Sequence, residues 1–408
     1  MKIAFVLTHF PALSETFILN QISGMIDRGH AVDIYADRPG SDSKIHPEVE
    51  SYGLLAKTRY APRMPGNTLV RFVKGAGIAA RHLVSSPSVV GRALNVMRHG
   101  SEASSLKLLY RAVPFLPERP SYDVIHAHFG QEGLRALALR DLGVLGGRLL
   151  TTFHGSDMSA YLRKAGPHVY DRLFANGDLF LPISERWRKA LVEMGCPPGK
   201  IVVHHMGIDC RRFRFRARQQ EAGQAPRLLS IARLVEKKGI EYAIRAAARL
   251  RGVDFHYDIV GDGPLRPSLE QLVRELGVSD RVTLLGWKQQ TEVVELLEGA
   301  HLLVAPSVTG RDGDQEGIPV AMMEAMAMGL PVLSTRHSGI PELVEDGQSG
   351  YLVPERDVDA LAEGLRRLLT APERWPAMGE AGRRRVEADY DINRLNDRLV
   401  GLFKLACV

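Results

Sequence analysis

Short apolar runs alternate with amphipathic helical stretches along almost the whole chain. Each run has three to six residues, which is typical of a strand buried on both faces of a sheet. In the first half we expect strands at 2–7, 31–36, 123–127, 149–153, 179–181 and 201–203. The pattern restarts, and further strands are expected at 227–231, 255–260, 282–284, 302–305 and 332–334. Strands separated by helices, such as the one expected at 14–29, predict βα units and mostly parallel sheets.

The restart of this pattern divides the 408 residues into two domains. The length exceeds one typical core, and a polar linker rich in Arg and Gln lies at 207–226. We expect an N-terminal domain at 1–206, a C-terminal domain at 207–385, and a helical segment at 386–408 that crosses back to the first domain. The predicted fold class is α/β, with two Rossmann-like doubly wound domains facing each other across a cleft. Such sheets bind ligands at the carboxyl ends of their strands.

Positive charge is concentrated in the segment 57–119, which separates two expected strands. This segment has eleven Lys and Arg and two Glu (11 − 2 = +9), whereas the whole chain carries +6. A basic, apolar-rich helical insertion predicts contact with an anionic membrane surface or a lipid phosphate. The alternative is an ordinary solvated face. We expect no nucleic-acid partner.

Cysteine usage and hydropathy bear on the compartment. Cys196, Cys210 and Cys407 show no metal-ligand spacing, which favours a reducing environment. The apolar run at the N-terminus is too short for a signal sequence, and no stretch approaches the ~20 apolar residues that span a bilayer. We therefore expect a cytoplasmic protein with peripheral contact at the inner face of the plasma membrane.

The segment 314–329 carries the strongest chemical signal. Pro319 suits the first turn of a helix, which places Glu316 and Gly317 at the helix entrance. Free N–H groups and the helix dipole favour a phosphate there, and a carboxylate beside it can accept hydrogen bonds from sugar hydroxyls. Glu324 lies about two turns deeper, within reach of a ribose diol. The alternative is a capping glutamate and a surface glutamate on a buried helix.

A second motif follows the expected strand at 227–231. Arg233 offers a planar fork of donors and Lys238 a mobile charge, and together they suit a diphosphate. Lys237 fits an ordinary surface lysine. A tight turn, Gly261-Asp262-Gly263-Pro264, follows the next strand, but such turns occur in many α/β proteins.

Histidines follow two strands of the first half. His128 comes after the strand at 123–127, and His154 after the strand at 149–153, with Asp157 close behind. We expect side chains at these carboxyl ends to point into the cleft. A lone histidine is more often structural, whereas two at equivalent strand ends favour a functional role.

With these motifs the chain resembles the retaining glycosyltransferases of family 4, which have the two-domain GT-B fold. The resemblance extends over nearly the whole chain. Glu316 and Glu324 match the family's Glu-x7-Glu motif, and the turn at 261–264 matches its nucleotide-pocket turn. The resemblance implies four catalytic residues: His154, Arg233, Lys238 and Glu316. It implies six donor-binding residues: Gly261, Asp262, Gly263, Gly317, Ile318 and Glu324.

The N-terminal motif departs from the commonest family pattern. Many members have a Gly-Gly loop after the first strand, whereas this chain has Phe10-Pro11-Ala12-Leu13-Ser14-Glu15-Thr16-Phe17. That stretch is similar to a subgroup associated with bacterial exopolysaccharide and colanic-acid-type assembly. The expected acceptor-binding residues are Ser14, Glu15, His128 and Asp157. For Ser14 the alternative is that it caps the following helix.

The resemblance implies transfer of a sugar from a UDP- or GDP-sugar to a glycan, a lipid-linked acceptor or a small molecule. We expect no cofactor and no metal, because Asp312-Gly313-Asp314, the nearest approach to an Asp-x-Asp site, reads as a loop. Two alternatives remain: a nucleotide-sugar 2-epimerase of the same architecture, and a non-catalytic nucleotide-sugar-binding protein. A nicotinamide dehydrogenase is disfavoured, because no Gly-x-Gly-x-x-Gly follows the first strand.

Overall fold

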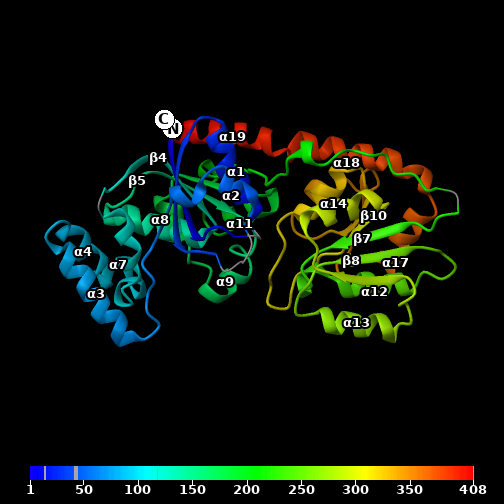
Figure 1. Cartoon of the computed structure of the whole chain (residues 1–408), viewed down its shortest axis with the longest axis horizontal. Helices are drawn as coiled ribbons and strands as arrows, with labels where there is room; N and C mark the ends of the chain where they lie inside the picture. Colours follow the sequence, from blue (N-terminus) through cyan, green and yellow to red (C-terminus); the bar gives the residue numbers. More distant parts are fainter. Residues whose placement is uncertain (13–14, 41–44, 117, 222, 408) are drawn as a thin grey trace.

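The first half of the chain forms a six-stranded sheet (Figure 1). The computed structural model describes residues 1–12, 15–40, 45–116, 118–221 and 223–407. The strands are β1 (Lys2–His9), β2 (Ala31–Arg38), β3 (Thr58–Tyr60), β4 (Ser121–His128), β5 (Gly146–Phe153) and β6 (Leu179–Pro182). They lie in the order β3-β2-β1-β4-β5-β6, and each pairing is parallel.

A second six-stranded parallel sheet lies beside the first. Its strands are β7 (Arg227–Ile231), β8 (His256–Val260), β9 (Val282–Gly286), β10 (Leu302–Ala305), β11 (Val332–Thr335) and β12 (Gly350–Val353). Their order is β12-β11-β10-β7-β8-β9. In each sheet the order reverses beside the first strand, which creates the crevice where doubly wound sheets bind ligands. The predicted α/β class with two Rossmann-like domains is confirmed.

Helices pack on the faces of both sheets. Six helices accompany the first sheet: α1 (Thr16–Asp27), α2 (Pro47–Ser51), α8 (Gly130–Leu142), α9 (Ala160–Ala165), α10 (Asp171–Asn176) and α11 (Glu185–Glu193). A separate group projects at the far end of the molecule in Figure 1: α3 (Thr68–Leu83), α4 (Pro87–Ala93), α5 (Val96–His99), α6 (Ser101–Ser104) and α7 (Lys107–Ala112). The second half has α12 (Ile240–Ala248), α13 (Arg266–Glu275), α14 (Gln290–Gly299), α15 (Val320–Ala327), α16 (Ile340–Leu343), α17 (Val358–Leu369), α18 (Trp375–Asp389) and α19 (Ile392–Cys407).

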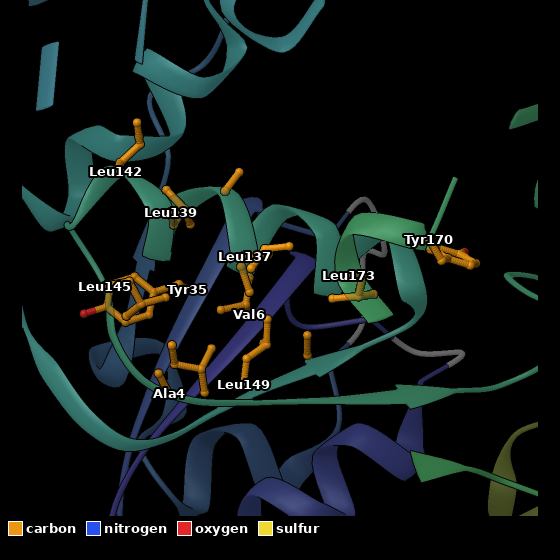
Figure 2. Close-up of a cluster of buried hydrophobic side chains, with 14 of the residues drawn as sticks. Ala4, Val6, Tyr35, Leu137, Leu139, Leu142, Leu145, Leu149, Tyr170 and Leu173 are labelled. Carbon is orange, nitrogen blue, oxygen red and sulfur yellow. The ribbon is translucent and has the colours of Figure 1, made fainter. Parts of the chain in front are cut away.

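The apolar runs are continuous because the strands are buried on both faces. In β1, Ile3 and Phe5 belong to a core cluster shared with α1 and α19, while Ala4 and Val6 belong to one shared with α8. Figure 2 shows the second cluster, in which leucines of α8 lie over β1. Full burial of a side chain such as valine or leucine contributes about 1.5–3 kcal/mol, so this packing holds the strands in place.

Three strand assignments differ from the sequence prediction. Residues 201–203 do not form a strand: Ile201 makes only an isolated bridge to Phe180 of β6. The structure adds β3, which lies inside the expected insertion 57–119 and pairs with β2 at the edge of the sheet. It also adds β12 at the edge of the second sheet. Both added strands are short edge strands: β3 is only half-buried and has no apolar run, whereas β12 is buried but has only four residues.

Two chain segments cross between the domains side by side. The N–H of Ile208 donates to the carbonyl of Tyr390 (3.0 Å), and the N–H of Ile392 donates to the carbonyl of Ile208 (2.9 Å). Helix α19 then packs against α1, where Arg28 pairs with Asp397 at 2.8 Å. In Figure 1 this helix runs along the first domain, and the two chain ends lie near each other.

Candidate active site

A pocket of ≈ 850 Å³ lies between the two domains. Ligand sites commonly measure about 300–1,000 Å³, so the pocket has room for a small-molecule substrate. The residues lining it from the first domain are Thr16, Phe17, Phe129, His154, Ser156 and Met206. The sequence-predicted site residues on its wall are His154, Arg233, Lys238, Gly261, Asp262, Glu316, Gly317, Ile318 and Glu324.

Two lysines and Glu316 form a charged cluster on the second domain's side of the pocket. A 3-10 helix, η5 (Glu236–Lys238), carries Lys237 and Lys238 just after β7. Lys238 Nζ lies 2.8 Å from Glu316 Oε2, and Lys237 Nζ lies 3.4 Å from Glu316 Oε1. Burial alone would raise the pKa of Glu316, but the two ammonium groups hold that pKa below its ordinary value. Glu316 is therefore ionised at neutral pH, and two positive charges stand beside it.

The position of Lys237 differs from the sequence prediction. It was expected to be an ordinary surface lysine, but it is partly buried and pairs with Asp314 at 2.8 Å as well as with Glu316. The N–H of Asp314 donates to the carboxylate of Asp312 at 3.0 Å. Within the described ranges, no group of three or more His, Cys, Asp or Glu side chains is placed to hold a metal ion.

The entrance to α15 lies against the first domain. The helix begins at Val320 with Pro319 as its N-cap, one residue later than the sequence placed it. A Cβ on Gly317 would lie 2.6 Å from the carbonyl oxygen of His154 and 2.5 Å from Ile183 Cδ1. Only a glycine allows the two domains to approach this closely here, and the same glycine presents its backbone to the pocket.

A second contact across the cleft involves Glu342. Its carboxylate accepts the backbone N–H groups of Glu185 (2.8 Å) and Arg186 (3.1 Å), at the first turn of α11 in the other domain. Two otherwise unpaired donors at a helix N-terminus thus receive a charged acceptor from the opposite domain. The structure is a closed arrangement in which both domains reach the pocket.

Glu324 lies on the second turn of α15 and faces the same pocket as Glu316. Burial raises its pKa, and the side chain of Gln290 donates to its Oε1 at 3.4 Å. Trp287, with 59% of its surface exposed, lines the pocket nearby on the loop after β9. Carboxylate, amide and indole thus share this side of the pocket.

The glycine turn after β8 supports the loop that carries Arg233. Gly261 has φ +132°, and a Cβ there would lie 1.9 Å from the carbonyl oxygen of Ala232. Asp262 lines the pocket and accepts the N–H of Gly263 at 2.7 Å. Gly263 is not among the pocket-lining residues; a Cβ there would lie 2.5 Å from the carbonyl oxygen of Leu234, so this glycine also supports the loop, and its donor contact stays a prediction. Arg233 is exposed on the pocket wall.

On the first domain's side, His154 reaches the pocket. Its Nε2 lies 3.0 Å from His128 Nδ1, and its Nδ1 lies 3.2 Å from the sulfur of Met206. The rings of Phe17 and Phe129 pack on it with centroids 4.7 and 4.5 Å away. Burial lowers the pKa of His154 to about 3, so its ring is neutral and acts through hydrogen bonds.

Two expected acceptor-binding residues lie behind the pocket wall. His128 and Asp157 are both 0% exposed. Asp157 accepts the N–H groups of Gly130, His154 and Gly155 at 3.0, 3.0 and 2.8 Å. In this structure neither side chain is exposed to the pocket, and acceptor binding by these two residues stays a prediction. Instead, His128 holds the ring of His154 and Asp157 holds its loop.

The remaining two expected acceptor residues lie in the first βα loop. Ser14 lies outside the described residues. Glu15 is the N-cap residue of α1, with no side-chain capping bond, and burial raises its pKa. It lines a separate hollow with Ile18 and His46 rather than the inter-domain pocket.

Sequence reasoning missed a histidine beside Glu316. His337 follows β11 and is 1% exposed. Its Nε2 accepts the backbone N–H of Glu316 at 3.1 Å, and its Nδ1 lies 2.6 Å from Glu355 Oε1. The three residues are distant in sequence, and the only signal for them is their common position after the carboxyl ends of neighbouring strands.

Comparison with protein families agrees with this geometry. The model described as glycosyl transferases group 1 matches residues 211–385, and the model for glycosyltransferase family 4 matches residues 14–212. Together the two matches span both domains and the pocket between them.

Curated relatives match over almost the whole chain. A putative colanic acid biosynthesis glycosyltransferase, WcaL, of Salmonella typhimurium is 42% identical, covering 99% of this chain and 100% of the relative. The amylovoran biosynthesis glycosyltransferase AmsK of Erwinia amylovora is 40% identical and covers 96% of each chain.

Solved structures share the fold. HepE of Anabaena, in complex with UDP, has a TM-score of 0.71 at 16% identity, covering 99% of this chain and 100% of the other. The lipopolysaccharide outer core galactosyltransferase WaaB has a TM-score of 0.70 at 18% identity, covering 99% of each chain. The chain belongs to the family of the colanic acid and amylovoran biosynthesis glycosyltransferases, and it is a glycosyltransferase with the GT-B fold.

Proposed function

We propose that the protein transfers a sugar from a UDP- or GDP-sugar with retention of anomeric configuration and without a metal ion. The observation that carries this proposal is the charged cluster on the pocket wall, where Lys237 and Lys238 flank the buried carboxylate of Glu316. A diphosphate needs cations and backbone donors, and a sugar needs hydrogen-bond acceptors. The pocket offers both, and the fold relative HepE was solved with UDP.

In this proposal the bond between the anomeric carbon and the diphosphate oxygen breaks as the acceptor hydroxyl attacks from the same face. The hydroxyl proton passes to the departing phosphate oxygen, so charge and atoms balance without an external reagent. Arg233 and Lys238 stabilise the negative charge that develops on the diphosphate. Glu316 accepts hydrogen bonds from the donor sugar, and Glu324 accepts them from the ribose. His154, neutral in its buried position, lies on the side of the transferred sugar, where its Nδ1 would exchange the weak contact with the sulfur of Met206 for a sugar hydroxyl.

The test is release of nucleoside diphosphate from a panel of UDP- and GDP-sugars, measured with EDTA and with added magnesium. Arg233→Ala and Lys238→Ala should lower turnover by about 10²-fold or more, because each removes a preorganised charge. Arg251→Ala, an exposed arginine of the same domain, is the matched control. Strict dependence on magnesium, or full activity in both variants, would contradict the proposal. Conversion of donor alone into a new sugar nucleotide would identify an epimerase instead.

We propose a bacterial exopolysaccharide or cell-surface glycan as the pathway product, with a glycan or lipid-linked acceptor. The support is the near full-length match to relatives named for colanic acid and amylovoran biosynthesis. The acceptor would enter from the first domain, whose contribution to the pocket is mostly aromatic and polar: Thr16, Phe17, Phe129, His154 and Ser156, together with Met206. Aromatic faces and hydroxyls suit a sugar ring better than a charged small molecule.

We further propose that α3 binds the inner face of an anionic membrane. Leu69 and Val73 of α3 are 74% and 65% exposed, and Val84, which follows the last residue of the helix, is 93% exposed. Between residues 60 and 101 the chain has six Lys or Arg and no Asp or Glu. Apolar side chains flanked by cations are typical of interfacial helices. Among the helices that the structure describes, none is long and apolar enough to cross a bilayer.

A further inference from the structure

We propose that His337 and Glu355 act as a positioning pair that fixes the backbone at Glu316 and so sets where its carboxylate meets the donor sugar. The proposal rests on the proposed function and adds two residues that do not line the pocket. Hydrogen bonds within the second domain link Glu355, His337 and Glu316.

The pair fixes the tautomer of the histidine. Because the N–H of Glu316 donates to His337 Nε2 at 3.1 Å, that nitrogen carries no proton. The proton of the neutral ring therefore lies on Nδ1 and is donated to Glu355 Oε1 at 2.6 Å. A carboxylate that orients an imidazole in this way gives the ring one stable tautomer and one rotation.

Glu355 holds the loop before α15 at both ends. Its Oε2 accepts the N–H of Thr309 at 2.7 Å, near the start of the loop. Its Oε1 accepts from His337, which in turn accepts from Glu316, near the end of the loop. This loop lies between β10 and α15 and has no strand partner of its own. Glu355 therefore anchors both ends of the segment that presents Glu316, while Glu236 and Ser159 hold its middle by accepting the N–H groups of Arg311 (3.1 Å) and Gln315 (3.3 Å).

One carboxylate oxygen of Glu316 makes no hydrogen bond in the part of the chain that the structure describes. Its Oε1 is buried and accepts no hydrogen bond within the described residues, although Lys237 Nζ lies 3.4 Å away. The residue lines the pocket. The ammonium of Lys237 balances the charge of this oxygen without a short hydrogen bond, and a donor-sugar hydroxyl would supply the hydrogen bond that it lacks. The direction of this oxygen depends on the peptide that His337 holds.

The experiment compares three variants on whichever donor the wild-type protein turns over. His337→Leu should lower kcat/KM by about 10²-fold, mainly through kcat, since a shift of about 1 Å in a reacting geometry has that effect. Affinity for the free nucleoside diphosphate should stay within about twofold, because Arg233 and Lys238 bind that part. His337→Gln should recover activity to within about tenfold of wild type, because its side-chain oxygen can accept the N–H of Glu316.

His301→Leu is the matched control. His301 also accepts a backbone N–H, that of Arg227 at 3.0 Å, in the same domain but away from the pocket. It should lower stability without changing kcat. Wild-type kcat/KM in folded His337→Leu, or equal losses of kcat in the His337→Leu and His301→Leu variants, would overturn the proposal.

Hydrogen exchange separates this proposal from the proposed function. A peptide covering residues 309–318 should exchange faster in His337→Leu than in wild type, and His337→Gln should restore the protection. This readout needs no turnover, so it tests the positioning pair even if the wild-type protein consumes none of the donors. Unchanged exchange in His337→Leu would refute the pair, whereas absence of turnover in wild type contradicts the proposed function alone.

Discussion

Replacing Gly317 by alanine tests whether the closed arrangement is the active one. The added Cβ would lie 2.6 Å from the carbonyl oxygen of His154, whereas ordinary contacts begin at 3.4 Å. The domains must therefore separate by 3.4 − 2.6 = 0.8 Å at this point. The two nearest atoms, of His154 and Ile183, both belong to the first domain, so the second domain itself can accept the methyl group.

A misplacement of about 1 Å between reacting groups can lower the rate about 10²-fold. Gly317→Ala should therefore fold normally and keep its affinity for the free nucleoside diphosphate, but lose about two orders of magnitude in kcat. Gly199→Ala is the control, because a Cβ there meets nothing within 4 Å. Kinetics would be combined with small-angle scattering, which should show a more open molecule in the presence of donor. Wild-type kcat in Gly317→Ala, with unchanged compactness, would refute the reasoning.

Three further predictions concern the membrane face, the Glu316 cluster and the second domain contact. Replacing both Lys74 and Arg81 by glutamine should weaken sedimentation with phosphatidylglycerol vesicles about 30-fold, at about 1 kcal/mol per charge; unchanged sedimentation would exclude this surface. The pKa of Glu316 is lower in the folded protein than its ordinary value of 4.5. The ionised carboxylate therefore stabilises the fold above pH 4.5, and this stabilisation is lost as the pH falls through the pKa of the folded state. The difference in melting temperature between wild type and Glu316→Gln should therefore shrink in acid, and a difference that grows would contradict the cluster. Glu342→Ala removes the charged acceptor at the N-terminus of α11, which stabilises the contact between the domains by about 1 kcal/mol. The donor KM should therefore rise about fivefold. Replacement of an exposed glutamate, Glu363→Ala, should leave the donor KM unchanged.

Strands and motifs could be predicted from the sequence because they depend on local pattern. Ten of the twelve strands coincide with apolar runs, since a strand buried on both faces is continuously apolar. The strand predicted at 201–203 was wrong, because this segment lies beside β6 with a single bridge rather than a ladder of paired residues. The edge strand β3, Thr58–Tyr60, was missed because its residues are only half buried and carry no apolar run.

Pairwise contacts of the site could not be read from the chain. Lys237 looks like a surface residue until the loop at 312–316 folds over it. His128 lies at the end of a strand, as expected, but the ring of His154 covers it. The sequence therefore predicted the place of His128 at the sheet edge, but not its burial. The link from Glu355 through His337 to Glu316 joins three loops, and only the parallel order of β10, β11 and β12 brings them together.

The most direct test of the central claim is calorimetric titration of UDP and GDP into the wild-type protein and into Lys238→Met, with EDTA present. We expect one nucleotide to bind the wild-type protein without a metal. Loss of the Lys238 charge should weaken this binding at least about tenfold, because a hydrogen bond to a charged group contributes about 1.5–3 kcal/mol. Equal binding by both proteins would contradict the placement of the diphosphate at Lys238. Binding that appears only with magnesium would contradict metal-independent recognition.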